Sequence, residues 1–521
     1  MSRGNYRRIT MSHGTVVKKI QEFGGSVPQA ARNLGVPVRT LYRWYQRPQN
    51  VNKNVNRFVV TYAQNATQVH KGFYGALMNY LHHWRAELIC FKGLYRNPKT
   101  QEDAADHRHV RDLWWTSEIQ PFLLDTERTL NENLVIYPAR TQPTSVAPLS
   151  GYDSHTGDKS GIFPHPKIHL KTVPTPGSKM PKILTTTGAI TEKNYSRSKA
   201  GEKGQYHHKI GAVVVEVVNN EIFHLRHIEA EDNGTFYDIA GGKCWKYSPD
   251  GIEKRQSIEV LTKGDIHYPW VDESVINASK ELISQLKPDK VYLHDLIDFW
   301  ARNHHVRNDR FLNYAKNLDD MQSVRDEMRG AAKFLTSLSS DKYELGIVVS
   351  NHDEALDRWL NEEKVDKLGI NASYFHWLSH KKHESAVKTG NGFSFMNMLE
   401  FAISEFITPS DHNIRFLKRD VAEVIRGIDY GMHGDVGPNG SRGSSTNLSK
   451  IGVKTTIGHA HSPSILNDCY QVGVNCIIPL GYTRGPLGWL HTDCITYRNG
   501  KRTLINYING KWYLKNDGKG K

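Results

Sequence analysis

The chain has 521 residues, of which 38% are hydrophobic, and its 68 Lys and Arg against 54 Asp and Glu give a formal net charge of +14. This composition predicts a globular protein of two to four domains, and the basic excess favours a polyanionic partner. The sequence has no run of about 18 apolar residues and no apolar signal segment within Met1–Thr10, so we expect neither a membrane partner nor export. Five scattered cysteines without a CxxC pair argue against a disulfide scaffold or a thiolate zinc site, and favour reduced thiols in a cytoplasm.

Residues 1–50 form a strongly basic segment, in which nine Lys and Arg face one acid and the net charge is +8. Ser26 can cap a short helix with Pro28 in its first turn, and Gly35 supplies a turn before a second helix. This pattern resembles the helix-turn-helix of DNA-binding proteins. The resemblance predicts that four side chains of the second helix contact DNA, namely Arg39, Tyr42, Arg43 and Arg47. A basic helical hairpin used for packing or assembly is the alternative.

Two segments of different composition follow the basic one. Residues 51–135 are expected to be mostly helical, because apolar residues such as Phe73, Leu77 and Leu81 recur at helical spacing. Residues 136–210 are rich in Pro, Gly and Ser, and they predict either an irregular linker or an extended arm ordered on neighbouring parts. Such a long arm is easiest to explain if it packs on a neighbouring subunit or domain, and we expect a homo-oligomer.

Strand patterns begin at Gly211, and Asn219-Asn220 can turn the first two strands into a hairpin. We assign one large domain to residues 211–510, with a helical insert at about 354–427 that could cap a site. Residues 511–521 form a basic tail.

Five short apolar runs in this large domain share one property, since each is followed at once by Asp, Asn or His. In open α/β sheets, functional loops gather beyond the carboxyl ends of strands, so five such loops can converge. In extended chain, residues two apart point the same way, which would let Asp265 with His267, and His459 with His461, present ligands together. The five loops are Gly264–His267, His294–Asp298, Ser350–Asp353, His433–Asp435 and Gly458–His461.

The donor atoms in these loops are carboxylate and amide oxygens and imidazole nitrogens, without a thiolate. This set suits hard or borderline divalent ions such as Mn²⁺, Mg²⁺, Fe²⁺ or Zn²⁺. Seven side chains exceed the need of one ion, whereas two ions bridged by a carboxylate would use them all. The seven are Asp265, His267, Asp295, Asn351, His433, His459 and His461.

The ordered series D-x-H, D-x-x-D, N-H-D, H-G and G-H-x-H over residues 265–461 resembles the calcineurin-like metallophosphoesterase superfamily. The resemblance implies an α/β sandwich of two mixed β-sheets flanked by helices, here behind an N-terminal helix-turn-helix-like region, with 211–510 as the catalytic domain. It also implies two divalent metal ions, for which we favour Mn²⁺. One ion would take Asp265, His267, Asp295 and His461, and the other would take Asp295, Asn351, His433 and His459.

Three further residues receive roles from the same resemblance. His352 would contact the phosphoryl group and protonate the leaving oxygen, while Asp298 and Asp353 would orient ligand or catalytic histidines. Two positions depart from the superfamily pattern, because His294 and Ser350 stand where it usually has Gly. Their side chains put the local turn geometry in question, although no expected ligand is lost.

The superfamily acts on many phosphoesters, and the basic N-terminus favours DNA among them. The combination of DNA-binding features with this core is similar to nucleases of double-strand-break repair complexes. The stretches Leu184–Thr191, Tyr195–Ser198 and Gly488–His491 resemble the nucleases of T5-like phages that act in DNA transfer and host-DNA degradation.

We therefore expect a two-metal DNase that hydrolyses phosphodiester bonds with a metal-activated water. If it is phage-encoded, it would act in the cytoplasm of a bacterial host. A phosphomonoesterase for phosphoprotein or nucleotide, and a DNA-binding regulator with a structural phosphoesterase core, are the alternatives.

Overall fold

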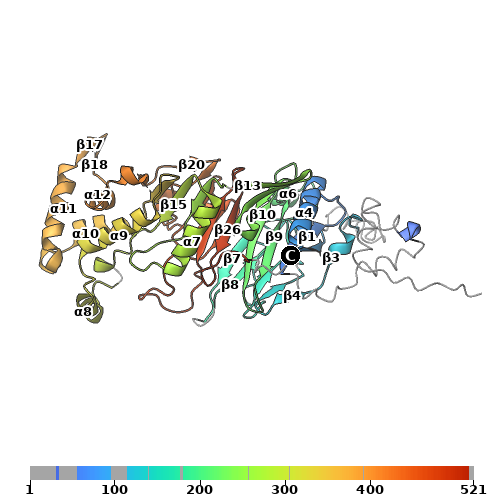
Figure 1. The fold of residues 1–521 in the computed structure, drawn as a ribbon, viewed down its shortest axis with the longest axis horizontal. Helices are drawn as coiled ribbons and strands as arrows, with labels where there is room; N and C mark the ends of the chain where they lie inside the picture. Colours follow the sequence, from blue (N-terminus) through green and yellow to red (C-terminus); the bar gives the residue numbers. More distant parts are fainter. Residues whose placement is uncertain are drawn as a thin grey trace, which may run out of the picture.

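The structure is a computed structural model of the chain, and it describes residues 31–34, 56–95, 114–138, 140–176, 180–255, 257–303, 306–390 and 392–515. These residues form a mixed α/β fold in which three large β-sheets are stacked as layers between helices. Figure 1 shows the layers following one another along the long axis of the molecule. Within the described parts of the chain, no helix is both long enough and apolar enough to span a membrane.

The first layer is a six-stranded sheet. Its first four strands run parallel to one another, and each of the last two strands pairs antiparallel with the strand before it. Because parallel strands end at the same edge, the loops after them open on one side of the sheet. In spatial order the strands are β19 (Ile414–Leu417), β16 (Glu344–Val348), β15 (Lys290–His294), β14 (Val260–Thr262), β25 (Thr492–Thr496) and β26 (Arg502–Asn506).

Two amphipathic helices, α7 (Glu273–Leu286) and α9 (Val324–Leu338), belong to the same hydrophobic core as one face of this sheet. Alternation along β15 explains the two faces, because Val291 and Leu293 belong to the helix-side core while Tyr292 stacks on Tyr430 on the other side. Helix α7 begins after Asp272, whose carboxylate accepts hydrogen bonds from the first-turn amides.

The second layer is a ten-stranded sheet assembled from two distant parts of the chain. Residues 128–185 supply five strands at one side, and residues 424–471 supply the other five, with β23 pairing antiparallel to β7. In spatial order the strands are β20 (Val424–Ile425), β21 (Ile428–Asp429), β22 (Lys454–Ile457), β24 (Cys469–Gln471), β23 (Ser464–Leu466), β7 (His169–Val173), β8 (Lys182–Thr185), β6 (Ser160–Ile162), β5 (Leu134–Ile136) and β4 (Arg128–Asn131).

The third layer is a five-stranded sheet that packs on the second layer and on β25 and β26 through a shared apolar core. Its outer face is covered by α4 (Lys71–Trp84), whose Phe73, Leu77 and Tyr80 are fully buried. In spatial order the strands are β10 (Phe223–Glu229), β9 (Gly211–Val217), β1 (Arg57–Gln64), β2 (Glu87–Gly93) and β3 (Leu123–Leu124).

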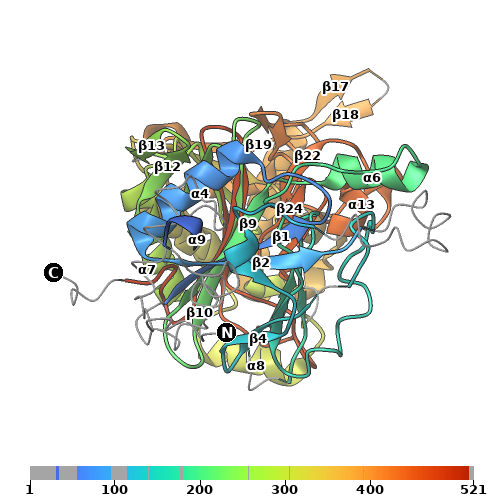
Figure 2. The same cartoon turned by 90° about the vertical axis from the view of Figure 1, so that its right-hand side faces the viewer.

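Smaller elements complete the fold. A short sheet contains β11 (Phe236–Asp238), β12 (Cys244–Ser248) and β13 (Gly251–Arg255), and a hairpin of β17 (Val387–Thr389) and β18 (Gly392–Ser394) projects from the body in Figure 2. The remaining helices are α6 (Lys199–His207), α8 (Arg310–Leu318), α10 (Ala355–Glu362), α11 (Ala372–Glu384), α12 (Met398–Ser404) and α13 (Ser445–Leu448). The expected helical insert thus holds α10, α11 and α12, but also a hairpin and β19.

The prediction that residues 51–135 are mostly helical is wrong. The helical spacing is real in α4, but strands β1 and β2 flank that helix and pair with each other in parallel. Every residue of β1 is buried, so its apolar run fills a core strand rather than one face of a helix.

The prediction of an irregular linker over 136–210 is wrong as well, whereas the alternative of an extended arm ordered on neighbouring parts is confirmed in part by the pairing of β7 with β23. The segment contributes β6, β7 and β8 to the ten-stranded sheet, and each of these strands has only three to five residues. Residue 210 does not separate two domains either, because β9, which begins at Gly211, pairs with β1 from the segment before it. The predicted hairpin turn at Asn219-Asn220 does join β9 to β10. Apart from residues 31–34, the basic N-terminal segment lies outside the described residues.

Candidate metal centre

Five loops carry the predicted ligands, and each follows a strand as the sequence indicated. Three of these loops leave the parallel strands β14, β15 and β16 of the six-stranded sheet, and two leave β21 and β22 of the ten-stranded sheet. The centre therefore forms where the edges of two sheets meet. In chain order the loops carry Asp265 and His267, Asp295, Asn351 and His352, His433, and His459 and His461.

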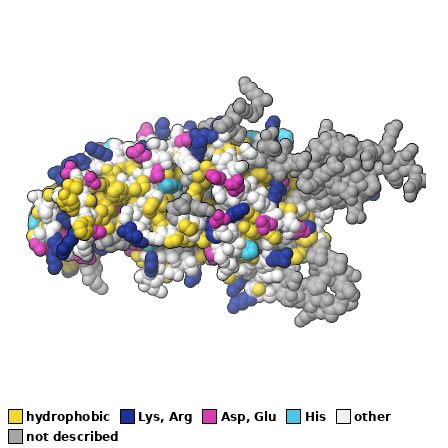
Figure 3. Space-filling view, turned by 90° about the horizontal axis from the view of Figure 1, so that it is seen from below, with side chains coloured by type: hydrophobic (Ala, Val, Ile, Leu, Met, Phe, Trp, Pro, Cys, Tyr) yellow, Lys and Arg dark blue, Asp and Glu magenta, His cyan; other side chains and the backbone are white. Residues whose placement is uncertain are grey.

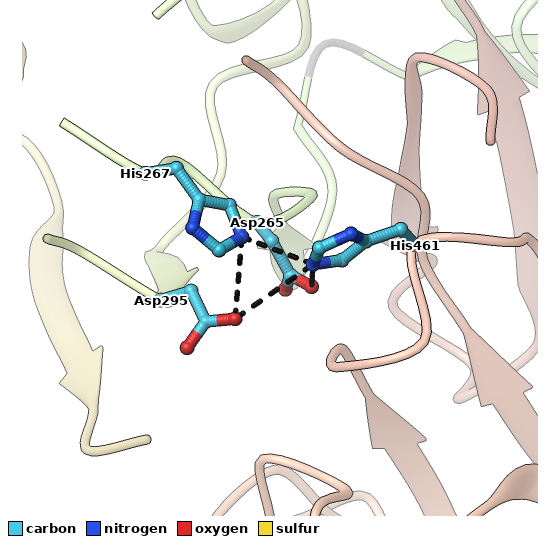
Figure 4. Close-up of side chains that lie close together, drawn as sticks. All are labelled: Asp265, His267, Asp295 and His461. Carbon is cyan, nitrogen blue, oxygen red and sulfur yellow. Dashed lines mark hydrogen bonds and ion pairs between the residues drawn. The ribbon is translucent and has the colours of Figure 1, made fainter. Parts of the chain in front are cut away.

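Four buried side chains converge on one point, as Figure 4 shows. The Nε2 atoms of His267 and His461 lie 3.0 Å apart. His267 Nε2 lies 3.4 Å from Asp295 Oδ2, and His461 Nε2 lies 3.2 Å from Asp265 Oδ2. One donor atom from each of the four residues falls within 4.8 Å of the others, so this cluster could hold a metal ion. These four residues are the set predicted for the first ion.

Two residues predicted for a second ion, His433 and His459, lie on the other side of Asp295. Its Oδ1 atom is 3.4 Å from His433 Nε2, while its Oδ2 atom faces His267 and His461. The ring of His459 lies 5.3 Å from the ring of His433, centroid to centroid. Asp295 thus presents one oxygen to each side, which is the arrangement that a bridging carboxylate requires.

Several polar atoms of this centre are buried without a hydrogen bond from any described residue. Such atoms are costly, because a buried polar group normally has a partner. All of them are groups that bind cations when unprotonated, and they come from four of the predicted ligands. The atoms are Asp265 Oδ1, both carboxylate oxygens of Asp295, Asn351 Oδ1 and His433 Nε2. This donor chemistry fits a divalent cation.

The electrostatics of the cluster also favour positive charge. Burial alone would raise the pKa of Asp295, but the facing imidazoles, with His433 foremost, hold it well below its usual value. Burial would lower the pKa values of His433 and His461, yet the carboxylates of Asp295 and Asp265 raise both to about 9. Without a metal, protons supply the charge that the carboxylates attract.

Four of the predicted ligands have a left-handed backbone, a conformation that non-glycine residues rarely adopt. The φ angles are 52° at His267, 45° at Asp295, 74° at His459 and 60° at His461. The extended-chain argument is therefore wrong for His459 and His461, whereas Asp265 and His267 do present ligand atoms to one cluster. His461 turns toward the four-residue cluster, whereas the ring of His459 lies against His433.

Asp298 supports His267 from behind. Its Oδ1 atom lies 3.2 Å from His267 Nδ1 and accepts a hydrogen bond of 2.7 Å from the Tyr482 hydroxyl. Asn303 Nδ2 donates to the other oxygen at 2.8 Å. If Nδ1 of His267 donates to Asp298, Nε2 is left unprotonated, and Nε2 is the nitrogen that faces the cluster.

His352 lies beside this support, with its ring edge-to-face against His267 at 4.7 Å and its Nδ1 atom 3.8 Å from Asp298 Oδ1. Burial lowers the pKa of His352 to about 4, with Asp295 and Asp298 opposing that change. The imidazole is therefore neutral near pH 7.

Asp353 does not have the predicted place beside a histidine. Among the described hydrogen bonds, it accepts from the backbone amides of Ile297 and Ser350 and from the Ser350 hydroxyl. It thereby ties the loop after β16 to the loop after β15, and burial raises its pKa to about 7. Ser350, which stands where the superfamily pattern has Gly, donates two of these hydrogen bonds.

His294 is the second residue that stands where the superfamily pattern has Gly. It packs against His433, and their Nδ1 atoms lie 3.3 Å apart. The close packing is made possible by Gly458, where an added Cβ would lie 2.3 Å from Asp265 Oδ1 and 3.0 Å from His294 Cβ.

The sequence did not single out two neighbours of the centre. Tyr482 bonds Asp298, and Trp489 packs edge-on against His461 with the ring centroids 4.2 Å apart. Trp489 lies in Gly488–His491, a stretch that resembles phage nucleases but contains no ligand motif. Tyr482 lies in no motif at all.

A family model described as a homeodomain-like domain matches residues 14–51. The chain therefore carries a homeodomain-like N-terminal region, which overlaps the predicted helix-turn-helix and is compatible with DNA binding. Arg39, Tyr42, Arg43 and Arg47 fall inside this match but outside the described residues.

Fold and site together define a class, namely a mixed α/β protein whose two sheets bring a buried carboxylate–histidine cluster together. The chain is 32% identical over 502 residues to Protein A1 of Escherichia phage T5, a match that covers 93% of this chain and 86% of that protein. It belongs to the family of this phage protein. No solved structure matches the chain.

Proposed function

We propose that the chain is a metallophosphoesterase of the calcineurin-like type, and specifically a phosphodiesterase that cuts DNA. The observation that carries the proposal is the convergence of buried carboxylate, amide and imidazole groups from five strand-end loops, several of whose atoms have no hydrogen bond from a described residue. A purely structural core would have no physical reason to keep so many unsatisfied groups together.

Asp265, His267, Asp295 and His461 would hold one ion, and Asp295, Asn351, His433 and His459 a second. Bound there, divalent ions would lower the pKa of a water to make it a nucleophile and neutralise the phosphate charge. We favour Mn²⁺, with Mg²⁺, Fe²⁺ and Zn²⁺ as alternatives of similar ligand preference.

His352 would serve as the residue that protonates the leaving oxygen. Its imidazole is neutral in the absence of substrate because burial lowers its pKa to about 4. An anionic phosphate beside it would raise that pKa, so His352 would take up its proton together with the substrate. Asp298 would hold His267 through Nδ1 and stay near His352.

DNA is favoured as substrate by the homeodomain-like match at the basic N-terminus. The relationship to a phage protein supports a setting in an infected bacterium, where a DNase of this kind would degrade host DNA.

The proposal is tested with purified protein, supercoiled plasmid and linear DNA, each in Mn²⁺, Mg²⁺ or EDTA. We expect divalent-dependent cleavage that disappears in Asp295→Ala and persists in Asp341→Ala, a matched change at an exposed aspartate. Comparing circular with linear DNA separates endonuclease from exonuclease action. DNA binding without cleavage in any ion would favour a regulator instead. Hydrolysis of p-nitrophenyl phosphate but not of its bis ester would favour a phosphomonoesterase.

We also propose a homo-oligomer. Residues 136–210 do not support it, because this segment packs within its own chain. Helix α8 instead exposes Phe311, Tyr314 and Leu318 along one face, with 89%, 64% and 66% of each residue accessible. Figure 3 shows apolar side chains gathered over the end of the molecule that carries the helices of residues 310–384. A second copy would cover this face. A monodisperse monomer in light scattering would contradict the proposal.

A further inference from the structure

A cavity of about 300 Å³ opens beside His433. The loop of residues 419–422, which follows β19, forms one wall, and residues 431–438, which follow β21, form the next. Leu448 of α13 and Ile451 close the far side. The cavity thus shares His433 with the candidate metal centre, so that a molecule held at the centre could extend into it.

The walls are held close by specific backbone contacts. An added Cβ at Gly431 would lie 2.2 Å from the carbonyl oxygen of Val421, so only glycine lets the two loops approach this closely. Asp429 Oδ1 then accepts hydrogen bonds from the amides of Glu423 and Gly431 at 3.0 and 2.8 Å. The cavity is therefore a built feature of two hydrogen-bonded loops.

The lining is apolar over much of its surface. Val421 and Val436 are 54% and 44% exposed, so both side chains are open to a ligand in the cavity. The apolar lining residues are Val421, Ala422, Met432, Val436, Leu448 and Ile451.

One cationic side chain adds polarity to this lining. Arg419 donates a hydrogen bond of 2.7 Å from its guanidinium to the carbonyl oxygen of Val349, the first residue after β16, and it pairs with Asp435. The guanidinium therefore links the loop that carries Asn351 and His352 to the loop that carries His433. Three carboxylates, Asp420, Asp429 and Asp435, line the same cavity, so it suits the uncharged end of a ligand whose anionic end lies at the metal centre.

We propose that this cavity binds the nucleoside attached to the phosphate that the centre holds. Its volume lies at the small end of the range for ligand pockets, so it admits one nucleoside and not a stacked duplex. The inference rests on the proposed phosphodiesterase function and adds to it a base-contacting site. It also implies that the terminal or cleaved nucleotide is unstacked from its neighbours, as in enzymes that draw a base out of the helix.

Binding is measured first, because it does not depend on turnover. Isothermal titration of thymidine 5′-monophosphate into the full chain with Mn²⁺ gives the wild-type affinity. The double variant Val421→Leu with Val436→Leu adds bulk at the mouth, and we expect its affinity to fall at least about tenfold. The control is Val424→Leu with Val453→Leu, two valines that are 59% and 47% exposed and do not line the cavity. We expect no change in the control.

Cleavage is measured second, with thymidine 5′-(p-nitrophenyl phosphate) and with methyl p-nitrophenyl phosphate, which carries no nucleoside. We expect the double variant to reduce the ratio of the two kcat/KM values about tenfold or more. Loss of thermal stability is checked separately, and Val421→Leu alone replaces the double variant if that unfolds.

The possible results separate the two proposals. Absence of nucleotide binding, or equal affinity in wild type and double variant, overturns the cavity assignment. Failure of the wild type to cleave any diester, with nucleotide binding still reduced in the double variant, overturns the phosphodiesterase function and leaves the cavity as a nucleotide site.

Discussion

Two groups of buried histidines in this chain behave in opposite ways. At the candidate metal centre, carboxylates raise the pKa values of His433 and His461 to about 9, although burial alone would lower them. In the N-terminal half, burial lowers the pKa values of His165, His208 and His227 to about 4.

The difference lies in what faces each ring. Backbone carbonyl oxygens lie 3.0 Å from His165 Nε2, 3.0 Å from His208 Nε2 and 2.8 Å from His227 Nε2, so these neutral rings complete local hydrogen bonding. Carboxylates face His433 and His461 instead. Burial is therefore common to both groups, and the facing carboxylates set the upward direction of the pKa shift in His433 and His461.

The largest expected effect comes from removing the carboxylate that faces both sides of the centre. Asp295→Ala should abolish Mn²⁺ binding measured by titration calorimetry, because both predicted ions share this residue. DNA affinity should be spared if the N-terminal region carries it. Retained stoichiometric Mn²⁺ binding would refute the predicted bridging role.

His352→Ala should leave Mn²⁺ binding intact and lower turnover by roughly 10²–10⁴-fold, if His352 supplies the proton. The pH–rate profile should lose one limb, an effect that a change in packing alone would not produce. Loss of metal binding in this variant would instead place His352 among the ligands.

The third prediction concerns pH. With pKa values near 9, His433 and His461 both carry protons at pH 7 in the metal-free protein, and a metal must displace them. Metal affinity should therefore rise with pH up to about 9, by about tenfold per unit for each proton released. Titration calorimetry in buffers of different ionisation enthalpy counts the protons. Affinity that stays flat between pH 7 and 9 would contradict the assignment.

Asp298→Asn should weaken Mn²⁺ binding by about 10–100-fold, because it disturbs the partner of His267 Nδ1 without removing a ligand. Tyr482→Phe removes only the hydroxyl that donates to the same carboxylate, and its effect should be smaller. Equal effects of the two variants would argue that Tyr482 acts on the centre by another route.

The last prediction concerns the other histidine group and its effect on stability. Folded pKa values of about 4 lie below the unfolded value near 6.5, so the unfolded chain binds more protons between these limits. The free energy of unfolding should thus fall as pH drops from 6.5 toward 4, by about 1.4 kcal/mol per pH unit for each histidine. Urea titrations at pH 7, 6 and 5 measure this slope. His227→Gln should reduce it by one histidine's share, and an unchanged slope would contradict the assignment.

The sequence predicted the candidate ligands well where a metal-binding residue type directly follows a strand. Each ligand follows a short apolar run, and the runs proved to be strands whose ends meet, so the loops with Asp265, Asp295 and Asn351 could be placed in advance. Side-chain direction could not be derived, because His459 and His461 have left-handed backbones that no alternation rule covers. Tyr482 reaches Asp298 from 184 residues away, and local spacing carries no trace of that contact.

The fold was less predictable in its first 210 residues. Strands of three to five residues in β6, β7 and β8 are too short to give a periodic signal, and their prolines and glycines read as linker. Strand β7 joins them to β23, which lies near residue 465, so only tertiary structure completes this part of the sheet.

The ten-stranded sheet has a consequence for how the protein is made. A ribosome releases β4 to β8 long before β20 to β24, and His461 is the last of the predicted ligands to emerge. Strands β25 and β26, which close the other sheet, come later still. A nascent chain that ends before His461 therefore lacks one ligand of the four-residue cluster and the strands that complete both sheets.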